Sequence, residues 1–87
     1  MKIIKPAKSG TLESNDILIM VYPNEEGKVE IHLESIVKKQ FGERIIEVIE
    51  DKLKEMRVES VTIKAQDKGA LDYTIAARVE TAVMRAV

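Results

Sequence analysis

Runs of apolar residues at strand spacing predict three β-strands. Ile17–Tyr22 is a continuous apolar run whose β-branched members favour a strand buried on both faces. Apolar and polar residues alternate over residues 28–33, which is typical of a half-buried strand. The short loop with Gly27 between these segments predicts a β-hairpin. A third alternating segment, residues 58–65, predicts another strand.

Apolar residues at helical spacing predict two amphipathic helices. The first starts near Ile36, where Ser35 can cap it, and Gly42 predicts a break or kink. Its apolar face comprises Ile45, Ile46, Ile49, Leu53 and Met56. The second helix follows a turn at residues 67–69, in which Asp67 is placed to cap it. Its apolar residues recur every four positions and are expected in the core: Leu71, Ile75, Val79 and Val83.

Residues 1–15 form a lead-in segment before the first long apolar run. An edge strand is expected near residues 2–5, because the following Pro6 cannot donate a ladder hydrogen bond and so suits an edge. The order after the lead-in is strand, strand, helix, strand, helix. A strand–helix–strand unit favours a right-handed crossover when its strands are parallel neighbours. We therefore expect one α+β domain over residues 1–87, a two-layer α/β sandwich with both helices on one face of a small sheet.

Composition narrows the class of function. The 87 residues are 45% hydrophobic and 33% charged, but only one Phe and two Tyr occur, so the core must be aliphatic. A net charge of -1 with both signs scattered gives no basic field for a phosphate backbone. Scarce aromatics leave few platforms for base stacking. Nucleic-acid binding is therefore disfavoured.

Several chemistries and compartments are disfavoured by what the sequence lacks. There is no Cys, which rules out disulfides, thiol nucleophiles and thiolate metal sites. No apolar run approaches the length of a membrane span. The N-terminus lacks the long apolar region of a secretory signal. These observations predict a cytoplasmic protein that does not bind a membrane.

Intrinsic catalysis is not indicated by any motif. His32 is the only histidine, lies on the polar side of its predicted strand and is expected to be an ordinary surface residue. No serine sits in a G-x-S-x-G motif, and zinc would need several His or Cys ligands. The four glycines are isolated, so neither nucleotide-binding loop is present. We expect no catalytic residues and no metal site.

Ser14 is the one candidate for covalent chemistry. It lies in the polar segment Gly10-Thr11-Leu12-Glu13-Ser14-Asn15-Asp16, immediately before the first apolar run. A serine in such a place is most often a turn residue whose hydroxyl bonds to nearby backbone. A functional serine would need an exposed hydroxyl, an adaptable backbone and small hydrophilic neighbours. Gly10, Thr11, Asn15 and Asp16 permit this second interpretation.

The same segment resembles the serine segment of the citrate lyase acyl carrier protein, the gamma subunit of that complex. Lys39-Gln40-Phe41-Gly42 is similar to the start of the family's main helix, and Asp67-Lys68-Gly69-Ala70-Leu71-Asp72 to its second short motif. Pro6-Ala7 and the alternating Arg78, Val79, Val83 and Arg85 also match, so the resemblance covers nearly the whole chain. Asn15 departs from it, because the family often has glycine there.

The resemblance implies a non-catalytic carrier with its prosthetic group on Ser14. In the family a holo-synthase joins the serine hydroxyl through a phosphodiester to 2'-(5''-phosphoribosyl)-3'-dephospho-CoA, whose thiol carries acyl groups. An alpha subunit exchanges acetyl for citryl, and a beta subunit cleaves citryl to oxaloacetate. The carrier tethers the thioester, which raises its local concentration at each partner site.

Other interpretations remain open at this point. A malonate decarboxylase carrier bears a related group on a similar serine segment. An unmodified α/β interaction module would use Ser14 only as a turn residue. The segment from Asp67 to Asp72 is either a turn with a helix cap or a surface that docks partner subunits, to which Lys68 would contribute.

Overall fold

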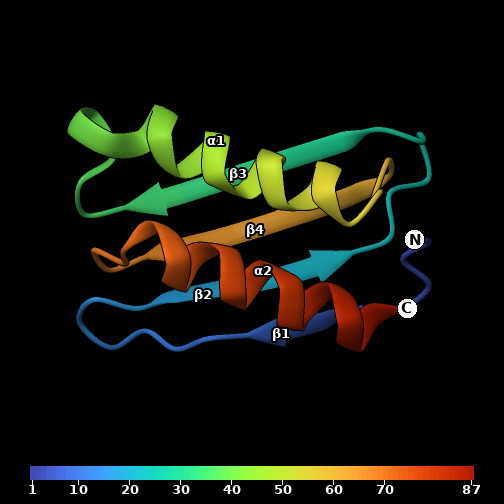
Figure 1. Ribbon diagram of the computed structural model, residues 1–87, viewed down its shortest axis with the longest axis horizontal. Coiled ribbons are helices and arrows are strands. Elements are labelled where there is room, and N and C mark those ends of the chain that lie inside the picture. Colours follow the sequence, from blue (N-terminus) through green and yellow to red (C-terminus); the bar gives the residue numbers. More distant parts are fainter.

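Four strands and two helices make up the chain in this computed structural model, which describes residues 1–87 (Figure 1). Their bounds are β1 Ala7–Ser9, β2 Ile17–Tyr22, β3 Val29–Ser35, α1 Lys38–Glu55, β4 Val61–Asp67 and α2 Asp72–Ala86. The predicted order of strand, strand, helix, strand, helix is confirmed from β2 onward. The lead-in contributes a further short strand, β1.

The strands form one mixed sheet in the order β1-β2-β4-β3. Strand β4 is antiparallel to β2, from Ile17 opposite Asp67 to Tyr22 opposite Thr62, and parallel to β3. The predicted hairpin between β2 and β3 is therefore wrong, because β4 lies between them. The helical connection through α1 returns the chain parallel to β3, and β4 then pairs with β2 on its other side.

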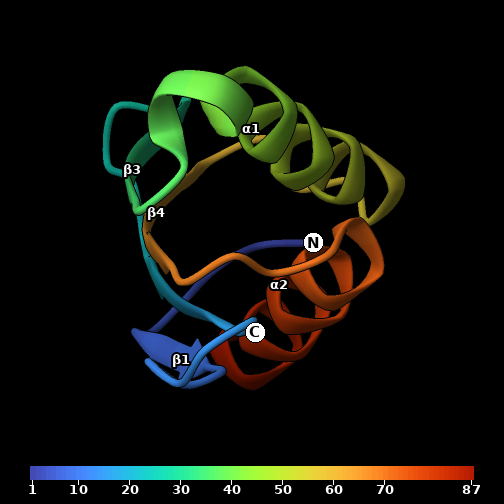
Figure 2. The ribbon, with the colours of Figure 1, turned by 90° about the vertical axis from the view of Figure 1, so that its left-hand side faces the viewer.

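Both helices lie on one face of the sheet, as predicted (Figure 2). Strand β2 consequently alternates: Ile17, Ile19 and Val21 are buried under the helices, while the residues between them are only half-buried. The expectation that β2 is buried on both faces is wrong, since no layer covers the second face. The buried residues that α1 and α2 bring to the core are Ile45, Val48, Ile49, Leu53, Ile75, Val79, Ala82, Val83 and Ala86.

The lead-in strand lies later than predicted. The expected edge strand near residues 2–5 is absent, and β1 follows Pro6 at the edge of the sheet. The backbone N–H groups of Ile4 and Lys5 instead donate to the carbonyl oxygen of Ala86, at 2.9 and 3.2 Å. The first residues therefore pack against the end of α2 rather than join the sheet.

The first helix also begins later than expected, at Lys38. Ser35 ends β3 and does not cap α1, but its hydroxyl accepts the Val37 N–H at 3.1 Å and supports the turn before the helix. Gly42 causes no break, since it lies buried within a continuous α1. A Cβ at Gly42 would stand 3.1 Å from Lys38 Cγ, so a larger residue there would have to displace the Lys38 side chain slightly.

The last two elements are shifted from their predicted bounds. Strand β4 runs over Val61–Asp67 rather than residues 58–65, because α1 closes with backbone hydrogen bonds as far as Val58. Helix α2 starts at Asp72, and its predicted core stripe is confirmed for Ile75, Val79 and Val83. Leu71 precedes the helix and is exposed. On α1, Ile46 and Met56 are only half-buried.

Candidate functional site

Ser14 lies in the exposed loop between β1 and β2. The Asp16 N–H donates to the Glu13 carbonyl oxygen at 3.2 Å, which closes a β-turn with Ser14 and Asn15 at its two central positions. Asn15 has a positive φ of 64°, a conformation that glycine and asparagine tolerate best. This geometry explains how Asn15 can stand where the similar family often has glycine.

Gly10 opens this loop at a position that no other residue fits. Its φ is +99°, in the region that favours glycine. A Cβ there would lie 1.8 Å from the Ile17 carbonyl oxygen, because the loop turns back tightly onto the start of β2. The close approach fixes where the loop leaves β1 and enters β2.

Asp16 anchors the loop to the last helix. Arg78 of α2 donates from Nε to Asp16 Oδ1 at 3.0 Å and from Nη2 to Asp16 Oδ2 at 2.8 Å, a two-pronged contact. The Thr11 hydroxyl and the Ile17 N–H donate to the same carboxylate. The Arg78 hydrogen bonds are the main reason that the pKa of Asp16 falls from 3.8 to about 2, against the opposing effect of burial.

A second anchor joins the loop to the β4–α2 turn. The Asn15 N–H donates to the Lys68 carbonyl oxygen at 2.8 Å, and the Lys68 N–H donates to the Asp16 carbonyl oxygen at 2.9 Å. This pair of bonds places the segment around Ser14 beside the segment around Lys68. The two motifs that the sequence analysis singled out therefore form one surface (Figure 1).

Asp67 organises that neighbouring turn from within. Its buried carboxylate accepts hydrogen bonds from the Ser35 hydroxyl at 2.8 Å, the Gly69 N–H at 3.1 Å and the Ala70 N–H at 2.9 Å. Asp67 thus stabilises the turn, and the prediction that it caps the second helix is wrong, because the N-cap position of α2 is Leu71. The bond to Ser35 was not foreseen and ties the end of β3 to the end of β4.

The Ser14 side chain is exposed, and its hydroxyl takes part in none of the hydrogen bonds of the chain. The common role of a turn serine, a hydroxyl bonded to nearby backbone, is therefore not the one seen here. The loop is held by Asp16, Asn15 and Gly10 rather than by Ser14.

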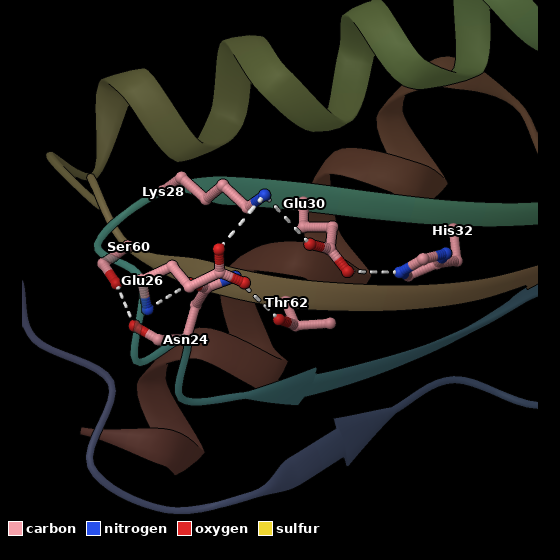
Figure 3. Close-up of polar contacts among 7 residues, drawn as sticks. All are labelled: Asn24, Glu26, Lys28, Glu30, His32, Ser60 and Thr62. Atoms are coloured by element: carbon pink, nitrogen blue, oxygen red, sulfur yellow. Dashed lines mark hydrogen bonds and ion pairs between the residues drawn. The ribbon is translucent and has the colours of Figure 1, made fainter.

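His32 and its neighbours form a separate polar cluster on β3, the start of β4 and the loops that precede these strands (Figure 3). As expected, His32 is exposed, and its Nε2 lies 2.7 Å from Glu30 Oε2. This hydrogen bond is the main reason that the pKa of Glu30 is lowered. No three His, Asp or Glu side chains of the chain are grouped to hold a metal ion. Neither helix has the length and apolarity that crossing a membrane requires.

The sequence and the fold were then compared with known proteins. Residues 4–86 match the family model of acyl carrier proteins described as "Malonate decarboxylase delta subunit (MdcD)". The chain is 51% identical to the citrate lyase acyl carrier protein of Clostridium perfringens over 99% of this chain and 85% of that protein. It is 48% identical to the Vibrio cholerae protein of the same name, over 99% of this chain and 88% of that one.

Among solved structures, a chain of a Pseudomonas malonate decarboxylase hetero-tetramer in complex with malonate has the same fold. The TM-score is 0.81 at 20% identity, with 100% of this chain and 93% of that chain covered. At 20% identity this likeness shows the fold alone, whereas the sequence relatives and the family model show the family. The chain belongs to the family of acyl carrier proteins that includes the malonate decarboxylase delta subunit and the citrate lyase acyl carrier proteins.

Proposed function

We propose that residues 1–87 act as one acyl carrier domain that bears phosphoribosyl-dephospho-coenzyme A on Ser14. The observation that carries the proposal is the free, exposed hydroxyl of Ser14 on a loop that other residues hold in place. Because Asp16 and Asn15 supply the anchors, the Ser14 oxygen can be esterified without breaking a hydrogen bond of the chain. The group fits an exposed loop that leaves the serine open to solvent.

The chain would present Ser14 but not activate it. Asp16 is a carboxylate within the loop, and Arg78 holds its pKa at about 2, so it is a weak base at neutral pH. The base that accepts the hydroxyl proton would therefore come from the holo-synthase that attaches the group. The arm's thiol, when bound, supplies the acyl-carrying sulfur that a chain without Cys lacks.

The partners we propose are the citrate lyase alpha and beta subunits. The Clostridium perfringens and Vibrio cholerae relatives, at 51% and 48% identity, are both citrate lyase acyl carrier proteins, which favours this complex over others. In it, the tethered acetyl and citryl thioesters would visit each subunit, and citrate would be cleaved to acetate and oxaloacetate. The carrier itself would be non-catalytic and cytoplasmic.

A malonate decarboxylase carrier is the second candidate. The matched family model is described by the delta subunit of that enzyme, and the fold of a malonate decarboxylase chain superimposes over the whole length. The two candidates share the attachment chemistry and differ in the acyl group and the partners. Adding the modified protein to citrate lyase alpha and beta subunits, and separately to malonate decarboxylase lacking its carrier, decides between them by which activity returns.

The attachment itself is tested by intact mass. The protein isolated from cells fermenting citrate should carry a mass increment equal to phosphoribosyl-dephospho-coenzyme A. Ser14→Ala should lose the increment, whereas Ser60→Ala, a serine in another loop, should keep it. An unmodified wild-type chain from those cells would reject the proposal and leave an interaction module, in which Ser14 is only a turn residue.

A further inference from the structure

A shallow apolar groove lies beside the Ser14 loop, at the end of the molecule that faces the viewer in Figure 2. It has a volume of about 550 Å³ and runs between the start of α1 and the start of α2. Its apolar wall residues include Val37, Phe41, Ile45, Leu71 and Tyr73. At one border, Arg44 Nη2 donates to Asp72 Oδ2 at 2.8 Å and bridges the two helices.

Three large apolar side chains of the groove lie outside the hydrophobic core and are exposed to solvent. Phe41, the only phenylalanine, is 54% exposed, Leu71 is 58% exposed and Tyr73 is 71% exposed. Single exposed apolar residues are ordinary, but a cluster that lines one groove marks a binding surface. The expectation that Leu71 belongs to the core stripe fails for the same reason, since it lines this groove instead.

The groove adjoins the attachment point through Gly69. Gly69 lines the groove, and the position of a Cβ on it lies 3.6 Å from the Asn15 side-chain oxygen. Asn15 follows Ser14 directly. The arm attached to the Ser14 oxygen would thus begin near the Gly69 end of the groove with its phosphoribosyl group. Its pantetheine lies beyond the phosphoribosyl, adenosine and diphosphate groups and would reach the groove when the flexible arm folds back. Gly69 has no side chain of its own, and the other neighbour of its Cβ position is Ile36 Cδ1, at 4.0 Å.

We propose that this groove binds the pantetheine portion of the arm while the carrier is between partner sites, an inference that rests on the proposed attachment at Ser14. Pantetheine combines methyl and methylene groups with two amides, which suits apolar walls with a polar border at Arg44 and Asp72. Attachment through a flexible arm supplies an effective concentration in the millimolar range, so a groove of weak intrinsic affinity is occupied for much of the time. The bound arm would keep its thioester away from water.

The first test compares amide spectra of the modified protein with those of Ser14→Ala, which carries no arm. Modification should shift the resonances of Phe41, Ala70 and Tyr73 in addition to those around Ser14. Amides of the loop at residues 23–28, at the opposite end, should not move. Shifts confined to residues 10–16 would overturn the inference, because they would describe an arm that remains in solvent.

The second test measures how fast iodoacetamide alkylates the arm's thiol. The modified wild type should react about twofold to fivefold more slowly than free coenzyme A, as expected for a tethered group that is bound half of the time or more. Phe41→Ser should remove this protection. Met84→Ser is the matched control, because Met84 is equally exposed at 54% but lies on α2 outside the groove.

The outcomes separate the inference from the proposed function. A chain without the mass increment rejects both. A modified chain whose thiol reacts as fast as coenzyme A rejects only the inference. Groove resonances that move solely after the alpha and beta subunits are added would assign the groove to partner docking, which also rejects it.

Discussion

The loop that carries Ser14 and the loop at residues 23–28 reverse the chain at opposite ends of β2, and they are secured in different ways (Figure 1). The Ser14 loop is tied to α2 by Arg78 and to the β4–α2 turn by Lys68. The other loop is held mainly by polar contacts with the adjoining strands and their loops (Figure 3). Asn24 Nδ2 donates to the Thr62 hydroxyl at 3.1 Å, and the Ser60 hydroxyl donates to the Asn24 carbonyl oxygen at 2.7 Å.

The ion pairs at the two ends of β2 also differ, in how far their side chains are exposed to solvent. The Asp16 side chain is only 13% exposed and meets Arg78 in two hydrogen bonds. Lys28 lies 3.7 Å from both Glu26 and Glu30, and all three side chains are exposed to solvent. Exposed pairs of this kind contribute little, whereas a largely buried, two-pronged contact fixes geometry. The comparison teaches that the long-range anchors are concentrated around the serine, although the serine hydroxyl itself makes no hydrogen bond.

The largest expected difference in stability between the two ends is that between alanine substitutions of Gly10 and of Gly27. Gly10→Ala should lower the free energy of unfolding by about 3 kcal/mol or more, because it combines a positive φ with a Cβ 1.8 Å from the Ile17 carbonyl oxygen. Gly27→Ala, at φ +72° with nothing within 4 Å of the Cβ, should cost only about 1 kcal/mol. Urea denaturation measures both, and equal costs would contradict the tight closure of the Ser14 loop.

A comparable contrast is expected between Asp67 and Asn24, the polar residues that organise a turn at each end. Asp67→Ala should cost about 2–4 kcal/mol, since it leaves the Ser35 hydroxyl and two backbone N–H groups without their buried acceptor. Asn24→Ala should cost about 0.5–1.5 kcal/mol, because that site is only partly buried. Thermal unfolding measures the ranking, which would be disproved if Asn24→Ala were the more damaging change.

Removing an ion pair is expected to lower stability less, and by an amount that depends on pH. Asp16→Asn should cost about 1–2 kcal/mol at neutral pH, given that Arg78 is partly open to solvent. Since the pKa of Asp16 is lowered from 3.8 to about 2, its stabilising effect is complete above about pH 4 and is lost as the pH falls toward 2. The difference between wild type and variant should shrink across that window.

Glu30→Gln is the control for this experiment. The pKa of Glu30 is also lowered, chiefly by the hydrogen bond from His32, but the side chain is exposed. Its substitution should leave the denaturation midpoint at neutral pH nearly unchanged. If Glu30→Gln destabilised the protein as much as Asp16→Asn, the contrast between the two ends would be lost.

The smallest effect on stability is expected at Ser14. Ser14→Ala should leave the unfolding midpoint unchanged, because the side chain is exposed and makes no hydrogen bond. The same variant is expected to abolish attachment of the prosthetic group. A clear destabilisation by Ser14→Ala would show that the hydroxyl has a structural role and would favour the simple turn interpretation.

Local patterns identified three of the four strands and both helices, and they located the serine. The bounds of β2 follow from the continuous run Ile17–Tyr22, whose β-branched side chains suit a pleated strand. The buried positions Ile49, Leu53, Val79 and Val83 follow from helical spacing. The position of Ser14 in a polar turn before an apolar run could also be predicted, because turns depend on the residues of a short local segment.

Hydrogen-bond and strand-pairing partners that lie far apart in the sequence were visible only in the tertiary structure. Nothing in the local pattern distinguishes Arg78, which holds Asp16, from Arg85, which donates to the Lys8 carbonyl oxygen. The insertion of β4 between β2 and β3, and the bond from Ser35 to Asp67, follow from strand pairing across the sheet. Periodicity determines which side of each element is apolar, whereas the choice of neighbour depends on the packing of the whole chain. The sequence thus determined most of the elements and the position of Ser14, and only the tertiary structure decided what surrounds that serine and that its hydroxyl is unpaired.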